Sequence, residues 1–458
     1  MATYDVVIKN GRVMDPESGF DKLANVGISG GTVQALSSEA LQGNEELDAT
    51  GHVVAPGFID LHSHGQDDEN YRIQAQDGVT TALELEVGTD DVDRWYGIRE
   101  GRALINFGAS AGHIPSRMKV LKDPGSFLPM GDAAHRHATE QEVGEILQLI
   151  ERGLQRGGLA VGFGLQYTPG ASRPEAIEAF KLGAKYNAPC HIHIRGMGPV
   201  EGVGGVEALE EAIAAAFITG APLHVVHISS VGLSITEKLL ELVGQAKERG
   251  LDITTECYPY TAGMSGIESA IFDEGWQERL GVGFDGLTWP DSGEPLTAST
   301  FAEYREKTGM VVVHFIPESQ MDAAVSSPLT AIATDGYLRN GAGHPRTAGT
   351  YARVLGHYVR ETKKLSLMDV LRKSAFMPAQ RLEVRAPAFK NKGRVRAGAD
   401  ADLAVFGPET VIDKSTYKQP NLPSVGFRHV LVKGVPVVRD GELQEGVAPG
   451  KGVRAPVS

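Results

Sequence analysis

Histidines recur in pairs along this chain, each pair at the end of a short apolar run. The first pair is His62 and His64, which end the run 58–64 (FIDLHSH). Successive side chains of a β-strand point to opposite faces, so these two imidazoles point the same way. Two imidazoles on one rigid face are a natural pair of metal ligands. Metal binding is therefore the first chemistry that the sequence indicates.

The run 82–87 (ALELEV) places two carboxylates, Glu84 and Glu86, in an apolar segment. Burying two carboxylates is costly unless positive charge compensates them, and a metal ion provides such charge. We expect Glu86, which is nearer the end of the strand, to be a ligand that can bridge two ions. We expect Glu84 to orient a histidine. In the alternative, both glutamates face outer helices and pair with Lys or Arg.

Two later runs, HIHIR and HVVHISS, contain His191 with His193 and His224 with His227. In each run the second histidine is nearer the C-terminal end of the strand, where barrel enzymes carry their functional groups. We therefore expect His193 and His227 to be metal ligands. We expect His191 to be a buried histidine with a hydrogen bond.

The last apolar run ends at Asp335, before Gly336. Alone, such an aspartate is typical of a turn or a helix N-cap, but histidines that converge on the same rim favour a catalytic role. Imidazoles and carboxylates suit Zn²⁺, as one ion or two. Zinc with an open coordination position lowers the pKa of water to about 7. Asp335 could then take a proton from the attacking water and deliver it to the leaving nitrogen, which predicts hydrolysis of amides or related acyl bonds.

Elements that could position these residues fill the middle of the chain. Apolar runs alternate there with helical patterns, which predicts an α/β fold, a (β/α)8 TIM barrel over residues 56–385. A long insertion at about 264–309, between the last two strands, is expected to form a lid or a binding wall. The candidate strands are 58–64, 79–87, 103–109, 159–165, 188–194, 222–228, 252–257 and 329–335, and the candidate helices are 140–156, 174–186, 206–219, 234–249 and 366–382.

Short β units occupy both ends of the chain. Turn signals at Asn10-Gly11 and Lys433-Gly434 predict a hairpin at each end. Each end alone has too few strands to be stable, so we expect residues 1–55 and 386–458 to form one small β-sandwich domain. Two unrelated flanking modules are the alternative.

Composition narrows the class of protein. The chain has 458 residues, 41% of them hydrophobic, and a net charge of −14, which argues against nucleic acid or an anionic membrane as a partner. Two cysteines are too few for a disulfide scaffold. Without a recognisable signal peptide or membrane span, we expect a cytoplasmic enzyme that acts on a small molecule. A homo-oligomer is compatible with this prediction.

Several longer segments carry a family resemblance. They are GLQYTPGASRPEAI, HIRGMG, CYPYTAG, TDG, GHPRTAGTYARVLGHYVRE and GRVRAGADADLAVF. In these segments the chain resembles the amidohydrolase superfamily, and within it the N-acyl-D-amino-acid deacylase (D-aminoacylase) family. The resemblance implies a barrel with a mono- or binuclear metal site at His62, His64, His193, His227 and Asp335. It also implies that His344 and Arg346 lie near the substrate and that Tyr258 polarises the scissile carbonyl.

Three positions depart from that family. A glutamate of the run LELEVG, Glu84 or Glu86, stands where the family has a metal-binding cysteine, which favours a bridged two-metal arrangement. Ser229 stands where the family has a lysine that grips the substrate carboxylate, and Met264 replaces a serine. A substitute positive charge could come from Arg117, Arg195 or Arg346.

These observations predict a metal-dependent hydrolase of a linear N-acyl amine, with N-acyl-D-amino acids as the leading substrates. Alternatives are a cyclic-amide hydrolase of the dihydroorotase or hydantoinase type, a dipeptidase, and an inactive barrel used as a binding module. A carboxylated lysine that bridges two metals is disfavoured, because Lys119 and Lys122 do not fall at a strand end and the fourth strand has no lysine.

Overall fold

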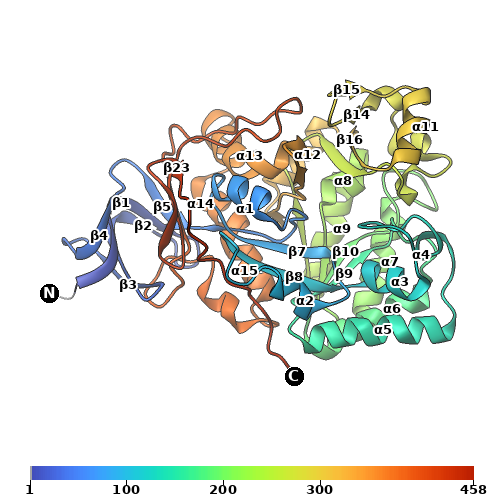
Figure 1. The fold of residues 1–458 in the computed structure, drawn as a ribbon, viewed down its shortest axis with the longest axis horizontal. Helices are drawn as coiled ribbons and strands as arrows, with labels where there is room; N and C mark the ends of the chain where they lie inside the picture. The colour runs from blue at the N-terminus through green and yellow to red at the C-terminus, as the bar shows by residue number, and fades with distance from the viewer. Residues whose placement is uncertain (1–2) are drawn as a thin grey trace.

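The barrel expected from the sequence is present in the computed structural model, which describes residues 3–458. Eight parallel strands follow one another in chain order around the barrel (Figure 1). Beyond the strand ends, the Asp335 N–H donates to the His62 carbonyl at 2.7 Å, which joins the last strand to the first. The predicted fold class is confirmed. The barrel strands are β6 (Phe58–Asp60), β7 (Val79–Thr89), β8 (Asn106–Gly112), β9 (Val161–Gly164), β10 (Cys190–His193), β11 (Leu223–Val225), β12 (Ile253–Cys257) and β17 (Thr330–Ile332).

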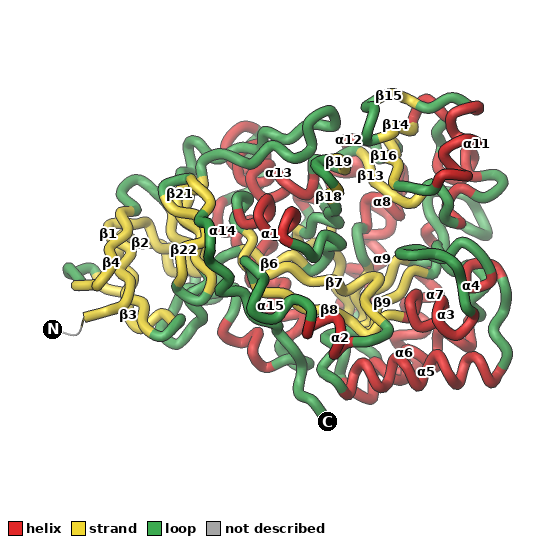
Figure 2. Tube along the Cα trace, viewed as in Figure 1, coloured by secondary structure: helices red, strands yellow, loops and turns green. Residues whose placement is uncertain are grey.

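Helices lie outside the strands, as the red and yellow segments of Figure 2 show. The capping box of Thr139 and Glu142 starts α5, and that helix buries Ile146 and Ile150. The main predicted helices correspond to α5 (Glu140–Gln155), α6 (Arg173–Tyr186), α7 (Gly205–Thr219) and α9 (Thr236–Glu248). The last predicted helix is α14 (Leu367–Leu371) and α15 (Met377–Leu382), joined by the π-helical turn 372–376. The other helices of the barrel region are α1 (Asp68–Ala75), α2 (Val92–Gly97), α3 (His113–Leu121), α4 (Asp132–His135), α8 (Ile228–Gly232), α12 (Glu318–Ser326) and α13 (Arg346–Arg353).

Strands from both ends of the chain form one nine-stranded sheet, seen at the left of Figure 1. The two ends meet where β5 pairs antiparallel with β20, with Ala55 opposite Ala404. The last residues leave this sheet and lie against the barrel, where the Val453 N–H donates to the Phe107 carbonyl. The strands are β1 (Thr3–Asp15), β2 (Phe20–Ser29), β3 (Thr32–Ser37), β4 (Gln42–Asp48), β5 (Val53–Pro56), β20 (Leu403–Phe406), β21 (Phe427–Val432), β22 (Val435–Arg439) and β23 (Glu442–Leu443).

One predicted turn is wrong. The hairpin at Lys433-Gly434 is confirmed, with both residues at positive φ between β21 and β22. Asn10-Gly11 instead lies inside β1 as a bulge, and the chain turns between Asp15 and Phe20. Asn10 has a φ of 59°, and its N–H donates to the Asn25 side chain, so the backbone bends without reversing.

The insertion between β12 and β17 is a folded unit, not a long loop. Four antiparallel strands form its sheet, and Trp276 stacks on Phe301 at 5.4 Å between ring centres. Figure 1 shows most of it in yellow, at the end of the molecule opposite the terminal sheet. Its elements are β13 (Ala262–Gly266), α10 (Trp276–Leu280), β14 (Leu287–Trp289), β15 (Glu294–Pro295), α11 (Ala298–Lys307) and β16 (Met310–His314).

Within residues 3–458, no helix combines the length and the apolar character needed to cross a membrane.

Candidate metal centre and active site

The histidines and carboxylates at the strand ends converge on one rim of the barrel. Their side-chain atoms form two groups, and in each group the possible ligand atoms lie within 4.8 Å of one another. The first group is His62, His64, Glu86 and Asp335, and the second is Glu86, His193 and His227. All six residues had been predicted as metal ligands, and the fold brings all six together.

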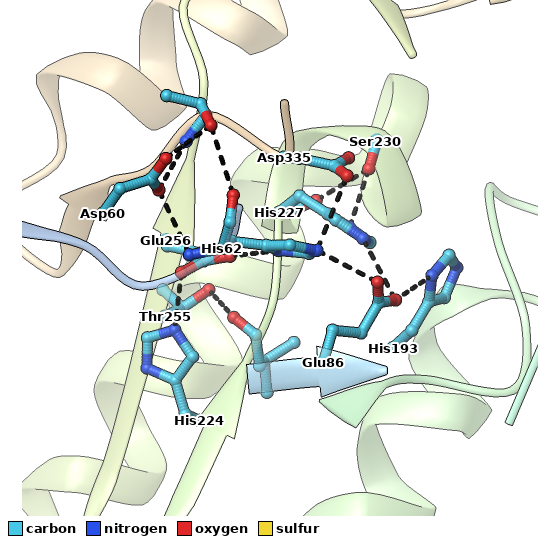
Figure 3. Close-up of polar contacts among 12 residues, drawn as sticks. Asp60, His62, Glu86, His193, His224, His227, Ser230, Thr255, Glu256 and Asp335 are labelled. Carbon is cyan, nitrogen blue, oxygen red and sulfur yellow. Dashed lines mark hydrogen bonds and ion pairs between the residues drawn. The ribbon is translucent and has the colours of Figure 1, made fainter. Parts of the chain in front are cut away.

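Glu86 on β7 connects the two groups, as Figure 3 shows. Its Oε2 lies 3.0 Å from His62 Nε2 and 3.2 Å from His64 Nε2. Its Oε1 lies 2.9 Å from His193 Nδ1 and 3.7 Å from His227 Nε2. One carboxylate therefore faces the histidines of both groups, which is the geometry that a bridging ligand needs.

Neighbouring side chains fix the orientation of three of these imidazoles. His62 Nδ1 lies 2.6 Å from Glu256 Oε1, and His64 Nδ1 lies 2.7 Å from Glu84 Oε2. Because an ionised carboxylate only accepts, each Nδ1 carries a proton and each Nε2 is directed at the ligand group. His227 Nδ1 lies 2.9 Å from the Ser230 hydroxyl, so the His227 ring is held in the same way. Glu84 thus orients a histidine, as expected.

Glu256 connects His62 to further buried polar residues. The other oxygen of Glu256 lies 3.0 Å from His224 Nε2, and His224 Nδ1 lies 2.7 Å from Thr254 Oγ1. His191 stacks on His224 with ring centres 4.3 Å apart. The hydrogen bond predicted for His191 is wrong, since neither of its ring nitrogens has a partner among the described residues.

Asp335 follows β17 in a strained backbone conformation, with a φ of 51°. Its N–H is tied to the His62 carbonyl, so the turn that carries it is anchored to the first strand. Its Oδ1 lies 3.2 Å from His64 Nε2, and its Oδ2 lies 2.9 Å from Arg346 Nη2. The carboxylate therefore faces the first ligand group on one side and a buried guanidinium on the other.

The charges of this centre are unbalanced. Four buried carboxylates, those of Glu84, Glu86, Glu256 and Asp335, face a single buried guanidinium. Burial disfavours the charged form of His62, but the carboxylates of Asp335 and Glu86 outweigh it and raise the pKa of His62 well above its usual range. Burial likewise opposes ionisation of Glu86, but His62 holds its pKa well below the usual range. This rim therefore attracts positive charge, and its imidazole and carboxylate donors fit one or two divalent cations.

The residues expected to contact the substrate differ in the contacts that they make around this centre. Tyr258, just after β12, is buried with its ring under the Arg346 guanidinium, 4.5 Å from ring centre to Cζ. His344 Nε2 donates to the Ala262 carbonyl at 2.9 Å, because a carbonyl oxygen only accepts. Arg346 keeps two buried nitrogens, Nε and Nη1, without a partner among the described residues. Ser229 is fully buried, and its hydroxyl has no partner there either.

Two of the other basic candidates are already neutralised. Arg195 forms a bidentate pair with Glu211 at 2.9 to 3.0 Å, and Arg117 pairs with Glu175 at 2.7 Å. The exposed Lys119 on α3 pairs with Asp90, and β9 contains no lysine. Arg346 is therefore the cation that directly contacts the centre.

Two cavities adjoin the rim. A large one of about 620 Å³ reaches His64, and the insertion provides much of its wall through Glu268, Trp289 and Asp291. A small one of about 30 Å³ lies against His193, His227 and Asp335. The predicted role of the insertion as a binding wall agrees with this placement.

Sequence reasoning missed the residues behind the first contacts. Glu256 lies in the run ITTEC of β12, one residue before its end, and its signal, a carboxylate in a buried strand, is the one that identified Glu84 and Glu86. Asp60 accepts from the N–H groups of His62 and Thr334 at 3.1 and 3.0 Å. It thereby connects the first barrel strand to the last, a contact that no local sequence pattern predicts.

A barrel whose strand ends hold histidines and carboxylates in two adjoining groups is the arrangement of a metal-dependent hydrolase. The amidohydrolase family model matches residues 45–111 and 117–438, and the chain belongs to this family. The family predicted from the sequence motifs is confirmed.

Within this family, the chain is similar over nearly its whole length to two deacylases and one solved structure. The N-acyl-D-glutamate deacylase of Alcaligenes xylosoxydans xylosoxydans is 27% identical, over 94% of this chain and 93% of the relative. The D-aminoacylase of the same organism is also 27% identical, over 95% and 94%. A crystal structure of N-acyl-D-glutamate deacylase from Bordetella bronchiseptica, complexed with zinc and a phosphonate inhibitor, superposes with a TM-score of 0.84 at 24% identity, covering 99% of this chain and 100% of that one.

Proposed function

We propose that this chain hydrolyses the amide bond of N-acyl-D-amino acids in a metal-dependent reaction. The observation that carries the proposal is the shared carboxylate of Glu86, which faces both ligand groups beside Asp335. The two deacylases named above, which align along nearly the whole chain, support the same substrate class.

Zn²⁺ is the proposed metal, held as one or two ions by residues of the two groups. The imidazole and carboxylate donors suit zinc, and the solved Bordetella bronchiseptica relative is a zinc complex. A cation held here supplies Lewis-acid charge, which polarises a carbonyl and makes water acidic enough to lose a proton near neutral pH. The ligands would be His62, His64, Glu86, His193, His227 and Asp335.

Asp335 is the proposed general acid and base. Burial opposes its ionisation, but Arg346 and His62 hold its pKa well below the usual range, so the carboxylate is available to accept a proton. Its backbone anchor on His62 fixes its position at the rim. It would take the proton of the attacking water and return it to the leaving nitrogen. Tyr258, buried in the same cavity lining, would donate a hydrogen bond to the carbonyl oxygen as water attacks and negative charge develops there.

Arg346 is the proposed anchor for the substrate carboxylate. Its guanidinium touches Asp335 through one nitrogen only, and two buried N–H donors remain without partners. A buried donor without a partner is costly, and a carboxylate would satisfy it. The neutral Ser229 hydroxyl, also without a partner, could add a weaker contact, while His344 holds the segment before Arg346 in place. Arg195 would act at a distance, if at all, because Glu211 neutralises it.

The test is amine release from matched panels of N-acetyl-D- and N-acetyl-L-amino acids, with zinc-loaded protein and a chelated control. The proposal predicts release from the D-series that the chelator abolishes. Equal release from both series would contradict the stereochemical part of the proposal. No release from either series by well-folded, zinc-loaded protein would contradict the substrate class, and dipeptides and cyclic amides would be assayed next.

A further inference from the structure

The small cavity beside the ligand groups has two unlike walls. His193, His227 and Asp335 form one wall together with the hydroxyl-bearing side chains of Tyr258, Ser230, Ser265 and Tyr167, and the rest of the lining is apolar. At about 30 Å³ the cavity has room for one or two water molecules, which is also the scale of a methyl group. Its main apolar lining residues are Met197, Ile271, Leu280, Val313 and Phe315.

The large cavity, which reaches His64, differs from the small one in size and polarity. It measures about 620 Å³, and charged side chains of both signs, Glu268, Asp291 and Arg339, line it together with Trp289. An amide cleaved between the two cavities must therefore present a small apolar end to one and a larger polar end to the other.

The carboxylate of the substrate determines which of the two cavities each end of the substrate enters. An amino acid carries a carboxylate, and the lining of the small cavity contains no cationic side chain, since Arg346 is not part of it and the Asp335 carboxylate is; burying the charge there would be costly. The alkyl end of an acyl group has no such cost. We propose, resting on the function proposed above, that the small cavity receives the acyl group, that the enzyme is selective for formyl and acetyl groups, and that Leu280 and Met197 set this limit.

Leu280 and Met197 are assigned this role because they separate two cavities. Both residues line the small cavity, and both also line a neighbouring cavity of about 420 Å³. Leu280 lies on α10 of the insertion and Met197 on the loop after β10, with exposed fractions of 3% and 5%. Shortening either side chain would join the small cavity to the larger one, so a longer acyl chain could extend there.

The experiment measures kcat/KM for formyl, acetyl, propionyl and butyryl derivatives of one D-amino acid, with zinc-loaded enzyme. An extra methylene in a closed apolar pocket changes kcat/KM by about 10- to 200-fold. We expect butyryl to be at least about 10-fold poorer than acetyl in the wild-type enzyme, and Leu280→Ala to raise the butyryl-to-acetyl ratio by about 10-fold or more. Met197→Ala should raise the same ratio, and it keeps the test open if Leu280→Ala folds poorly.

The matched control is Leu296→Ala. Leu296 is also a buried leucine of the insertion, at 4% exposure, but lines none of the three cavities. Its substitution should leave the butyryl-to-acetyl ratio unchanged. A wild-type enzyme that cleaves all four derivatives equally would overturn the acyl-size limit while leaving the deacylase function intact. An unchanged ratio in folded Leu280→Ala and Met197→Ala would overturn the role of these two residues, and no release from any derivative would overturn the proposed function and this inference with it.

Discussion

Substitution of Glu256 should weaken metal binding, because Glu256 contacts the candidate metal centre only through His62. Its carboxylate accepts from His62 Nδ1 at 2.6 Å and from His224 Nε2 at 3.0 Å, and it is 1% exposed. Removing it frees the His62 ring to rotate and to change tautomer. Substitution of a residue that orients a metal ligand typically lowers metal affinity by about 10- to 100-fold, or about 1.4 to 2.7 kcal/mol.

Glu256→Gln and Glu256→Ala should lower zinc affinity by different amounts. Glutamine offers one acceptor and one donor, so one of the two histidines must switch its proton. His224 can do so, because its Nδ1 faces the Thr254 hydroxyl, which donates or accepts equally well. His62 then keeps its tautomer, and Glu256→Gln should lower zinc affinity by about 10-fold. Glu256→Ala removes both contacts, and we expect a loss of about 100-fold.

The assay is zinc binding to metal-free protein by competition with a chelator of known affinity. The control is Glu175→Gln, since Glu175 is also buried and bonded to a histidine, His113 at 2.8 Å, but belongs to neither ligand group. That variant should bind zinc normally, even if it is less stable. Wild-type affinity in a folded Glu256→Ala protein would refute the reasoning, because His62 would then not depend on Glu256.

Three further predictions concern other buried charges. Asp335→Asn should retain the fold, because Asn tolerates the positive φ at this position, but it should lower kcat by several orders of magnitude through loss of proton transfer; near-normal turnover with metal bound would place the base elsewhere. Glu86→Gln should lower the zinc content measured by elemental analysis at both sites together, since both groups share this carboxylate; loss confined to one site would show that it does not bridge. Burial lowers the pKa of Lys373 to about 8, so the unfolded chain binds more protons than the native one between about pH 8 and 10.5. The stability of the wild type relative to Lys373→Met should therefore rise by about 3 kcal/mol across that window in denaturant unfolding, and a pH-independent difference would contradict it.

Periodicity and residue type were enough to predict the barrel. All eight strands were placed, because each is a short apolar run bounded by turn residues or a helical pattern. The rim residues followed from a single rule, that functional groups collect at the C-terminal ends of parallel strands. That rule also selected His193 over His191 and His227 over His224, and the structure brings the selected residues together.

Long-range contacts account for what was missed. The Asn10-Gly11 signal is local, but the pairing of β1 with β2 and the bond to Asn25 turn it into a bulge. The insertion looked irregular because its strands are only two to five residues long and its first strand, β13, pairs with its last, β16. Glu256 meets His62 across 194 residues of chain, a separation at which sequence pattern carries no signal. Prediction therefore succeeded where one strand positions one side chain, and failed where two distant segments position each other.

The most direct test of the account is amine release while zinc is added back stepwise to metal-free protein, with an N-acetyl-D-amino acid as substrate. The account predicts no release without metal and a rise to a plateau after one or two equivalents of zinc per chain. Metal-free protein that releases amine at the full rate would contradict it, because the clustered histidines and carboxylates would then not be the centre of the reaction.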